Sequence, residues 1–165
     1  MVEEKKSVKD WTYLPFIVTT SAGFVVAVLD FVFLQNLKSQ VIALVGLFLF
    51  SIGGYLRFKA RLQLKTKPGF SSLASTGKLH TMKGHQLVKD GLYMHIRHPI
   101  YLGETLRNFG IVTFLSSAYG ILFIAVATIL LLFRIEIEEK MLIEVFGEDY
   151  RKYQRNTKRI IPFVY

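Results

Sequence analysis

The chain has 165 residues, a length that suggests one domain. Hydrophobic residues make up 52% of it and the mean hydropathy is +0.37, which is high for a soluble protein of this charge. The net charge of +9 lies between long apolar runs, which indicates contact with anionic lipid headgroups rather than nucleic acid, and no nucleic-acid-binding motif is present. The absence of cysteine excludes disulfides, thiolate metal sites and cysteine nucleophiles.

The first two apolar runs are long enough to cross a bilayer. At about 1.5 Å per residue, a helix over 13–34 covers a hydrocarbon core of roughly 30 Å. Asp30, near the far end of this run, is expected at the membrane interface or, alternatively, beside a base within the membrane. A second span is predicted over 41–58, and its small residues indicate close contact with another helix: Gly46, Gly53 and Gly54.

A polar segment separates the second and third apolar runs. Lysine and arginine far outnumber acids over 59–90, and Pro, Gly and Ser punctuate it, so a cytoplasmic loop is predicted. The third predicted span, 99–115, is short and contains Glu104, Arg107 and Asn108. Glu104 and Arg107 are three residues apart and share a helix face, where they either form a structural ion pair or line the substrate path.

A fourth span is predicted over 118–134, and it continues as a charged cytoplasmic helix to Phe146. Gly147 is a candidate C-cap, followed by a short helix over 149–156. Counting spans places both termini and the basic loop in the cytoplasm. The predicted fold is an all-α, polytopic integral membrane protein with about four transmembrane helices and a cytoplasmic C-terminal helical segment, in a single domain over 1–165.

The stretch 91–103 lies where the basic loop gives way to an apolar segment. Arg97 and His98 place two hydrogen-bond donors at the edge of a hydrophobic phase, where unpaired polar groups are costly. Pro99 suits the first turn of a helix and disfavours helical geometry at His98. This pattern predicts a helix N-terminus with polar groups directed at an anionic ligand.

The residues of this stretch, taken with a second block, resemble a family signature. The pattern Gly91-x-Tyr93-x-x-x-Arg97-His98-Pro99-x-Tyr101-x-Gly103 is similar to that of the isoprenylcysteine carboxyl methyltransferases, integral-membrane enzymes related to phospholipid N-methyltransferases. The second block follows in family order with Arg134, Glu138-Glu139, Phe146-Gly147-x-x-Tyr150, Tyr153 and Pro162. The resemblance covers about residues 85–163.

The resemblance implies S-adenosylmethionine as methyl donor, S-adenosylhomocysteine as product, and no metal. Such a donor needs polar donors for its carboxylate, an acid for its ammonium or ribose, and an apolar wall for its adenine. The candidate cofactor-binding residues are His85, Gln86, Leu87, Val88, Tyr93, His98, Pro99, Ile100, Tyr101, Glu138 and Glu139. In the family the residue matching Arg134 faces the substrate carboxylate. The candidate catalytic residues are Arg134 and Arg97, and the candidate substrate-binding residues are Arg134, Glu104 and Asn108.

The methyl acceptor stays open between a carboxylate or thiol, such as an isoprenylcysteine-like group, and a phospholipid amine. A cation at Arg134 favours an anionic acceptor over an amine. A membrane scaffold or lipid-binding protein without turnover is the alternative from another class. Three histidines invite a metal interpretation, but neither spacing nor a carboxylate partner supports it. The expected partners are the bilayer and a lipophilic substrate, with no nucleic acid and no obligate protein partner evident.

Overall fold

The computed structural model describes residues 10–34, 39–65 and 87–161. Within these ranges the chain is helical and has no strand, only an isolated parallel bridge between Ile96 and Lys158. The prediction of an all-α fold is therefore confirmed for the described residues.

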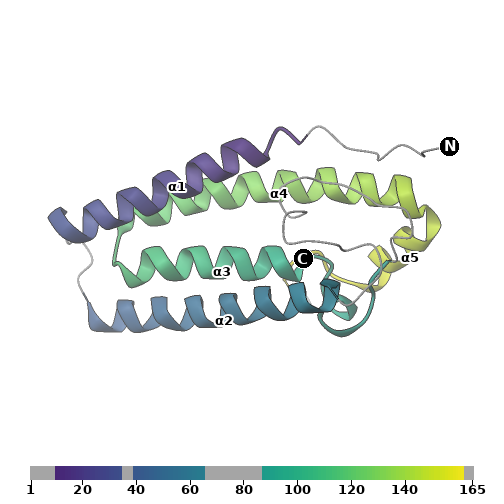
Figure 1. The fold of residues 1–165 in the computed structure, drawn as a ribbon, viewed down its shortest axis with the longest axis horizontal. Helices are drawn as coiled ribbons and strands as arrows, with labels where there is room; N and C mark the ends of the chain where they lie inside the picture. Colours follow the sequence, from purple (N-terminus) through teal and green to yellow (C-terminus); the bar gives the residue numbers. More distant parts are fainter. Residues whose placement is uncertain (1–9, 35–38, 66–86, 162–165) are drawn as a thin grey trace.

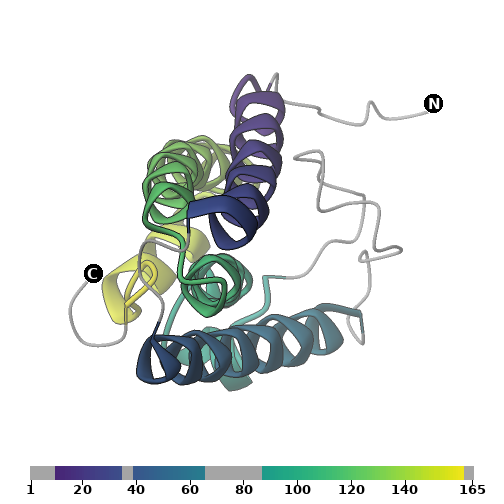
Figure 2. The same cartoon turned by 90° about the vertical axis from the view of Figure 1, so that its left-hand side faces the viewer.

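Two helix pairs form the body of the molecule. Helix α1 (Tyr13–Leu29) continues into a short π-helical turn (Asp30–Leu34) and lies along α4 (Ala118–Phe146). Helix α2 (Gln40–Lys65) lies along α3 (Pro99–Phe114), as Figure 1 shows. Helix α3 also contacts α1 and α4, so it occupies the middle of the bundle in the end-on view (Figure 2).

Glycines bring α2 and α3 into close contact. A Cβ atom added to Gly46 would lie 2.2 Å from the backbone nitrogen of Phe114, and one added to Gly53 would lie 2.3 Å from that of Arg107. Gly103 and Gly110 of α3 approach α2 equally closely. The predicted helix contact is thus confirmed for two glycines and wrong for Gly54, where an added Cβ would meet no atom of the described residues within 4 Å.

Three helical segments among the described residues are long and apolar enough to cross a membrane: Tyr13–Leu34, Gln40–Lys65 and Ala118–Phe146. Helix α3 has 16 residues, which at about 1.5 Å each give about 24 Å, less than a full hydrocarbon core. Its position between the other helices lets it contribute polar residues to the bundle interior.

Helix α2 is longer than the predicted span over 41–58, because residues 59–65, which were expected in a loop, belong to the helix. The added turns contain Ala, Arg, Leu, Gln and Lys, which are all good helix formers. This extension reaches the end of the bundle where α4 becomes charged after Phe133, which we call the charged end. There Gln63 Oε1 accepts a hydrogen bond of 3.2 Å from the backbone nitrogen of Leu92.

At the opposite end of the bundle, Asp30 is buried against the turn between α3 and α4. Its Oδ2 accepts a hydrogen bond of 2.7 Å from Ser117 Oγ, which itself accepts from the backbone nitrogen of Gly120 and caps α4. Asp30 therefore ties α1 to the start of α4, and the expectation of a position at the membrane interface missed this contact.

The charged end of the bundle is closed by short elements. A 3-10 turn (Gly91–Met94) precedes α3, and α4 ends at Gly147, whose φ of 56° favours glycine and confirms the predicted C-cap. Helix α5 (Glu148–Asn156) then turns back. The residues after α5 run beside the segment before α3, with Arg97 N donating to Lys158 O at 2.8 Å and His98 N to Arg159 O at 3.1 Å.

Candidate functional site

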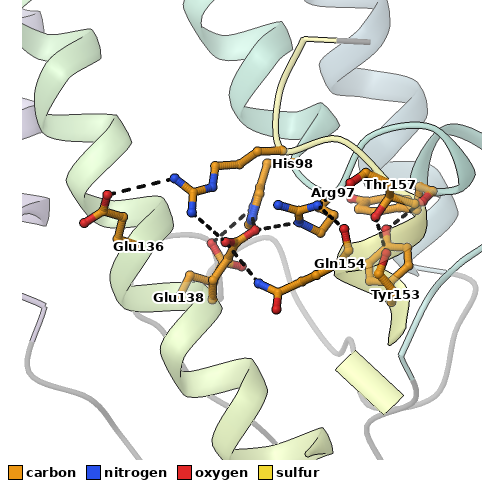
Figure 3. A network of polar contacts seen from close by, with 10 residues as sticks. Arg97, His98, Glu136, Glu138, Tyr153, Gln154 and Thr157 are labelled. Carbon is orange, nitrogen blue, oxygen red and sulfur yellow. Dashed lines mark hydrogen bonds and ion pairs between the residues drawn. The ribbon is translucent and has the colours of Figure 1, made fainter. Parts of the chain in front are cut away.

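Two segments that are far apart in the sequence supply the polar groups of the site. Pro99 begins α3, so His98 keeps a non-helical backbone (φ −122°) and its ring turns toward the charged end of α4. Glu138 and Glu139 lie on that part of α4; Figure 3 shows Glu138 near the His98 ring, and Glu139 Oε1 lies 3.2 Å from His98 Nε2. The structure therefore brings the two sequence blocks together at one end of the bundle.

Glu139 accepts contacts at both of its carboxylate oxygens. Oε1 lies 2.7 Å from Arg97 Nε and 3.2 Å from His98 Nε2. Oε2 lies 3.2 Å from Gln154 Nε2 and 3.1 Å from Arg159 Nη2. Only 4% of Glu139 is exposed, so this carboxylate is a buried connection between α3, α4, α5 and the following segment (Figure 3).

The guanidinium of Arg97 forms hydrogen bonds with other groups of the protein. Besides its bond to Glu139, Nη1 donates to the backbone oxygen of Gln154 at 3.2 Å and to that of Thr157. These two carbonyls lie at the end of α5, where helical carbonyls lack intrahelical partners. Arg97 thus fixes the end of α5 against the start of α3, and its candidate catalytic role stays a prediction.

Glu138 differs from its neighbour because one of its oxygens has no hydrogen-bond partner among the described residues. Glu138 Oε2 is buried and lies 3.9 Å from His98 Nδ1, too far for a hydrogen bond. The His98 ring stacks on Tyr101 with centroids 5.6 Å apart, which fixes its orientation. Tyr93 Oη is also buried without a hydrogen-bond partner in the part of the chain that the structure describes. Buried polar groups without partners mark places where a ligand can bind.

Three buried tyrosines, Tyr93, Tyr150 and Tyr153, lie in this part of the structure and stay protonated at neutral pH. Burial raises the pKa of Tyr93, Tyr150 and Tyr153 well above the usual range, and the charge of Glu138 adds to the effect at Tyr93 and Tyr150. Tyr153 Oη donates a hydrogen bond of 2.6 Å to the backbone oxygen of Tyr93, which locks the 3-10 turn against α5. The Tyr93 hydroxyl is consequently a neutral donor held in place.

Arg134 lies one helical turn before Glu138 on α4 and is almost completely buried. Its Nε donates to Tyr101 Oη at 3.2 Å, and its Cζ lies 5.2 Å from the centre of the Tyr13 ring. Its Nη1 lies 2.7 Å from Asp10 Oδ2. Residues just before and at the start of α1 therefore contact the site, which the sequence interpretation missed.

A second polar group lies between α2 and α3. Glu104 pairs with Arg107 at 2.6 Å, as the spacing suggested, and also with Arg57 of α2. Asn108 accepts from Arg107 at 3.2 Å and donates to Glu104 at 3.4 Å. The two candidate substrate-binding residues, Glu104 and Asn108, are thus tied into a network of charges within the bundle, and their contact with a substrate stays a prediction.

The remaining candidate cofactor-binding residues come from the stretch 85–88 and from the start of α3. His85 and Gln86 lie outside the described residues, and Leu87 is half-buried. Val88 is buried with Tyr93 and Ala60, and Ile100 packs against this cluster, which makes an apolar wall beside the polar site. Pro99 is fully buried.

Several residues that shape the site were absent from the sequence prediction: Asp10, Tyr13, Arg57, Gln63, Gln154 and Arg159. One signal was available, because Asp10 lies just before the first predicted span and Arg134 is the last residue of the fourth. An even number of crossings would place both on the same side of the membrane.

Comparison with known proteins identifies the family. The model of the isoprenylcysteine carboxyl methyltransferase (ICMT) family matches residues 44–144, which include the start of α3 and both glutamates of α4. The chain belongs to the isoprenylcysteine carboxyl methyltransferase family. It is accordingly an integral membrane protein, in agreement with its apolar helices.

Similar proteins include methyltransferases of two different names. The chain is 31% identical to protein-S-isoprenylcysteine O-methyltransferase of Schizosaccharomyces pombe over 133 residues, 80% of this chain and 54% of the relative. It is 34% identical to methanethiol S-methyltransferase 1 of Bradyrhizobium diazoefficiens over 94 residues, 52% of this chain and 32% of the relative.

The fold matches a solved structure of the same family. The structure of a eukaryotic intramembrane Ras methyltransferase (isoprenylcysteine carboxyl methyltransferase) superposes with a TM-score of 0.71 and 25% identity, over 92% of this chain and 53% of that chain. The chain spans about half the length of this structure and of the yeast enzyme, and about a third of the bacterial one. Among the described residues, no group of three or more His, Cys, Asp or Glu side chains is placed to hold a metal ion.

Proposed function

We propose that this chain binds S-adenosylmethionine at the charged end of its helix bundle and directs methyl transfer to the carboxylate or thiol of a lipophilic acceptor. The observation that carries the proposal is the buried Glu138 Oε2, which has no hydrogen-bond partner within the described ranges and faces His98 Nδ1 at 3.9 Å. The family membership and the names of the relatives support the reaction class.

The chemistry of the site fits this cofactor. Glu138 can accept from an ammonium or ribose hydroxyl, and the neutral Tyr93 hydroxyl can donate to a carboxylate. His98 and the backbone nitrogens at the start of α3 add donors at a helix N-terminus, where negative charge is favoured. The apolar surface of Val88, Tyr93 and Ile100 suits an adenine ring.

The structure supports different roles for the adjacent glutamates. Both oxygens of Glu139 are occupied by protein groups, so we assign Glu139 to positioning His98 and Arg97. We assign Arg97 a positioning role as well, because its Nε and Nη1 bind Glu139 and the carbonyls that end α5. Glu138 remains the candidate for direct contact with the cofactor.

When bound, the cofactor supplies an electrophilic methyl group on a sulfonium and leaves as S-adenosylhomocysteine. The residues of the chain hold donor and acceptor in line and exclude water, since proximity alone can contribute roughly 7–11 kcal/mol to such a reaction. Arg134, one turn from Glu138, would orient the acceptor head group. An amine acceptor is disfavoured, because a cationic head group would meet the Arg134 guanidinium.

The orientation in the membrane follows from charge. The site lies at the end of the bundle that carries the basic C-terminal residues, and basic residues are enriched on the cytoplasmic side. We propose that the site and both termini face the cytoplasm, with the cofactor entering from water and the acceptor from the bilayer.

The first experiment measures cofactor binding by Glu138→Gln. Titration of S-adenosylhomocysteine into the protein in nanodiscs, followed by calorimetry, should show binding at least tenfold weaker than wild type, since a buried charge-assisted hydrogen bond contributes about 1.5–3 kcal/mol. Glu148→Gln is the matched control, because Glu148 is an exposed glutamate on α5. Equal dissociation constants for wild type and Glu138→Gln would remove Glu138 from the site.

A second experiment separates an enzyme from a membrane scaffold. The protein in nanodiscs would be incubated with isotope-labelled S-adenosylmethionine and a lipid extract, and methylated products sought by mass spectrometry. A labelled carboxyl ester or thioether supports the proposed function, whereas a labelled amine would favour the phospholipid alternative. Failure of both cofactor binding and label transfer would favour the scaffold.

A further inference from the structure

The segment before α1 places a carboxylate on the guanidinium assigned to the acceptor. Asp10 Oδ2 lies 2.7 Å from Arg134 Nη1, and the two side chains are 6% and 3% exposed. The other oxygen of Asp10 accepts from the backbone nitrogen of Thr12 at 3.1 Å and from Thr12 Oγ1. Thr12 is completely buried, so the Asp10 carboxylate is held in position from behind.

Aromatic residues also contact Arg134. Tyr101 Oη accepts from Nε at 3.2 Å, and the Tyr13 ring lies 5.2 Å from Cζ on one face of the guanidinium. Tyr101 and Tyr13 are both uncharged, so neither cancels the positive charge of Arg134. Asp10 brings a negative charge to Arg134 from the N-terminal side of α1, in addition to the charge of Glu138 one helical turn away on α4.

The contact between Asp10 and Arg134 is an ion pair without hydrogen-bond geometry at the two atoms nearest each other. Arginine binds carboxylates most strongly through two parallel hydrogen bonds, and the nearest atoms, Asp10 Oδ2 and Arg134 Nη1, do not form one of these with each other. A carboxylate acceptor that approached Arg134 would meet the negative charge of Asp10 in a poorly solvated place and would have to displace it. An acceptor without charge at that point would meet no such opposition.

We propose that Asp10 is a specificity-determining residue, which competes with anionic acceptors for Arg134 and biases the site toward lipophilic acceptors that bind in an uncharged form, such as thiols. A thiol bound in this way gives up its proton to water as the bond between the methyl group and the cofactor sulfur breaks and the new carbon–sulfur bond forms. The inference rests on the proposed function and narrows its acceptor class. It assigns the segment before the first helix a part in substrate selection.

The test compares two ligands that differ in one charge and one methyl group: a farnesylated N-acetylcysteine with its carboxylate intact and the methyl ester of the same molecule. Dissociation constants are measured by calorimetry in nanodiscs for wild type and Asp10→Asn. Asp10→Asn should bind the acid at least tenfold more tightly than wild type does, while the affinity for the ester changes less than twofold. Asp10→Ser keeps an oxygen that can accept a hydrogen bond from the backbone nitrogen of Thr12, and it should also bind the acid more tightly than wild type does.

Asp149→Asn is the matched control, because it removes the same charge from an exposed position on α5 and should leave both affinities unchanged. An unchanged ratio of acid to ester affinity in both Asp10 variants, weaker binding of both ligands, or no binding of either ligand would overturn the inference. S-adenosylhomocysteine affinity is measured on the same samples. Intact cofactor binding with an unchanged ratio rejects only the role of Asp10, whereas a shifted ratio without cofactor binding rejects the proposed function and keeps that role.

Discussion

At the scale of single residues, the neighbouring acids Glu138 and Glu139 have opposite environments. Successive helical positions point about 100° apart, so Glu139 turns into the junction with α5 while Glu138 faces His98 and the tyrosines. Glu139 is satisfied by four donors, whereas Glu138 keeps a buried oxygen that no donor of the described residues reaches. A pair that looks equivalent in the sequence thus has one saturated carboxylate and one with a buried oxygen left over, which supports our proposal that Glu138 contacts the cofactor.

Arg97→Lys tests the supporting role. A lysine keeps the charge but cannot form the forked contacts to Glu139 and the carbonyls at the end of α5. We expect a local loss of about 2 kcal/mol, seen as roughly thirtyfold faster hydrogen exchange of the amides in α5.

Arg151→Lys is the control for this change, because Arg151 makes an exposed ion pair with Glu148 at 2.7 Å. Exposed pairs contribute about 0–1 kcal/mol, so exchange in α5 should change less than about fivefold. Equal effects of the two substitutions would show that Arg97 does not anchor α5.

At the scale of elements, the α2–α3 pair depends on glycines seven residues apart on each helix. Gly46 and Gly53 of α2 face Gly110 and Gly103 of α3, with backbone atoms where a side chain would otherwise lie. Small residues allow such approach, which compensates for the weak hydrophobic drive between helices in lipid. The same contact positions the start of α3, and with it His98.

Gly53→Ala should destabilise this pair. The added methyl group would lie 2.3 Å from the backbone of Arg107, so the helices must separate, and overpacking of this kind costs about 1–3 kcal/mol. Thermal unfolding in detergent, followed by circular dichroism, should show a lower midpoint.

The adjacent Gly54→Ala provides the matched control, since its new methyl group meets no atom of the described residues within 4 Å. In a helix interior alanine is favoured over glycine by about 1 kcal/mol, so the midpoint should stay the same or rise. A fall as large as that of Gly53→Ala would contradict the proposed contact.

At the scale of the whole molecule, the charged end is assembled from the segment before α3, the end of α4, helix α5 and the residues that follow it. Tyr93, Tyr150 and Tyr153 are buried in this junction, which raises the pKa of each phenol above its unfolded value of about 10. A group with a raised pKa contributes stability below the unfolded pKa and loses it as the pH rises further.

The junction should therefore weaken above about pH 10, by about 1.4 kcal/mol per pH unit for each buried tyrosine. The Tyr150 hydroxyl is buried and makes no hydrogen bond within the described residues, so Tyr150→Phe should leave stability at pH 7 nearly unchanged. Unfolding midpoints between pH 7 and 11 should fall less steeply for this variant.

Tyr119→Phe is the corresponding control, because Tyr119 is half exposed on α4. Its pH dependence should match that of wild type. A Tyr150→Phe variant with the wild-type slope would show that the junction does not depend on a neutral phenol there.

Much of the architecture could be predicted from the sequence, with limits that have physical causes. The long apolar runs predicted α1, α2 and α4, because a lipid-facing helix must be apolar along its length. The end of α2 was missed, since polar residues beyond the membrane continue the helix as readily as they form a loop. Gly46 and Gly54 look alike in the sequence, and only the direction each faces distinguishes them.

The sequence by itself determined that the chain is a helical membrane protein and which polar residues stand at the ends of its helices, because these follow from local hydropathy and from proline and glycine positions. Only the tertiary structure decided that Glu139 is saturated while Glu138 is not, that Arg97 holds α5, and that Asp10 reaches Arg134. These outcomes depend on distances between residues far apart along the chain, and such distances are set by how the helices pack.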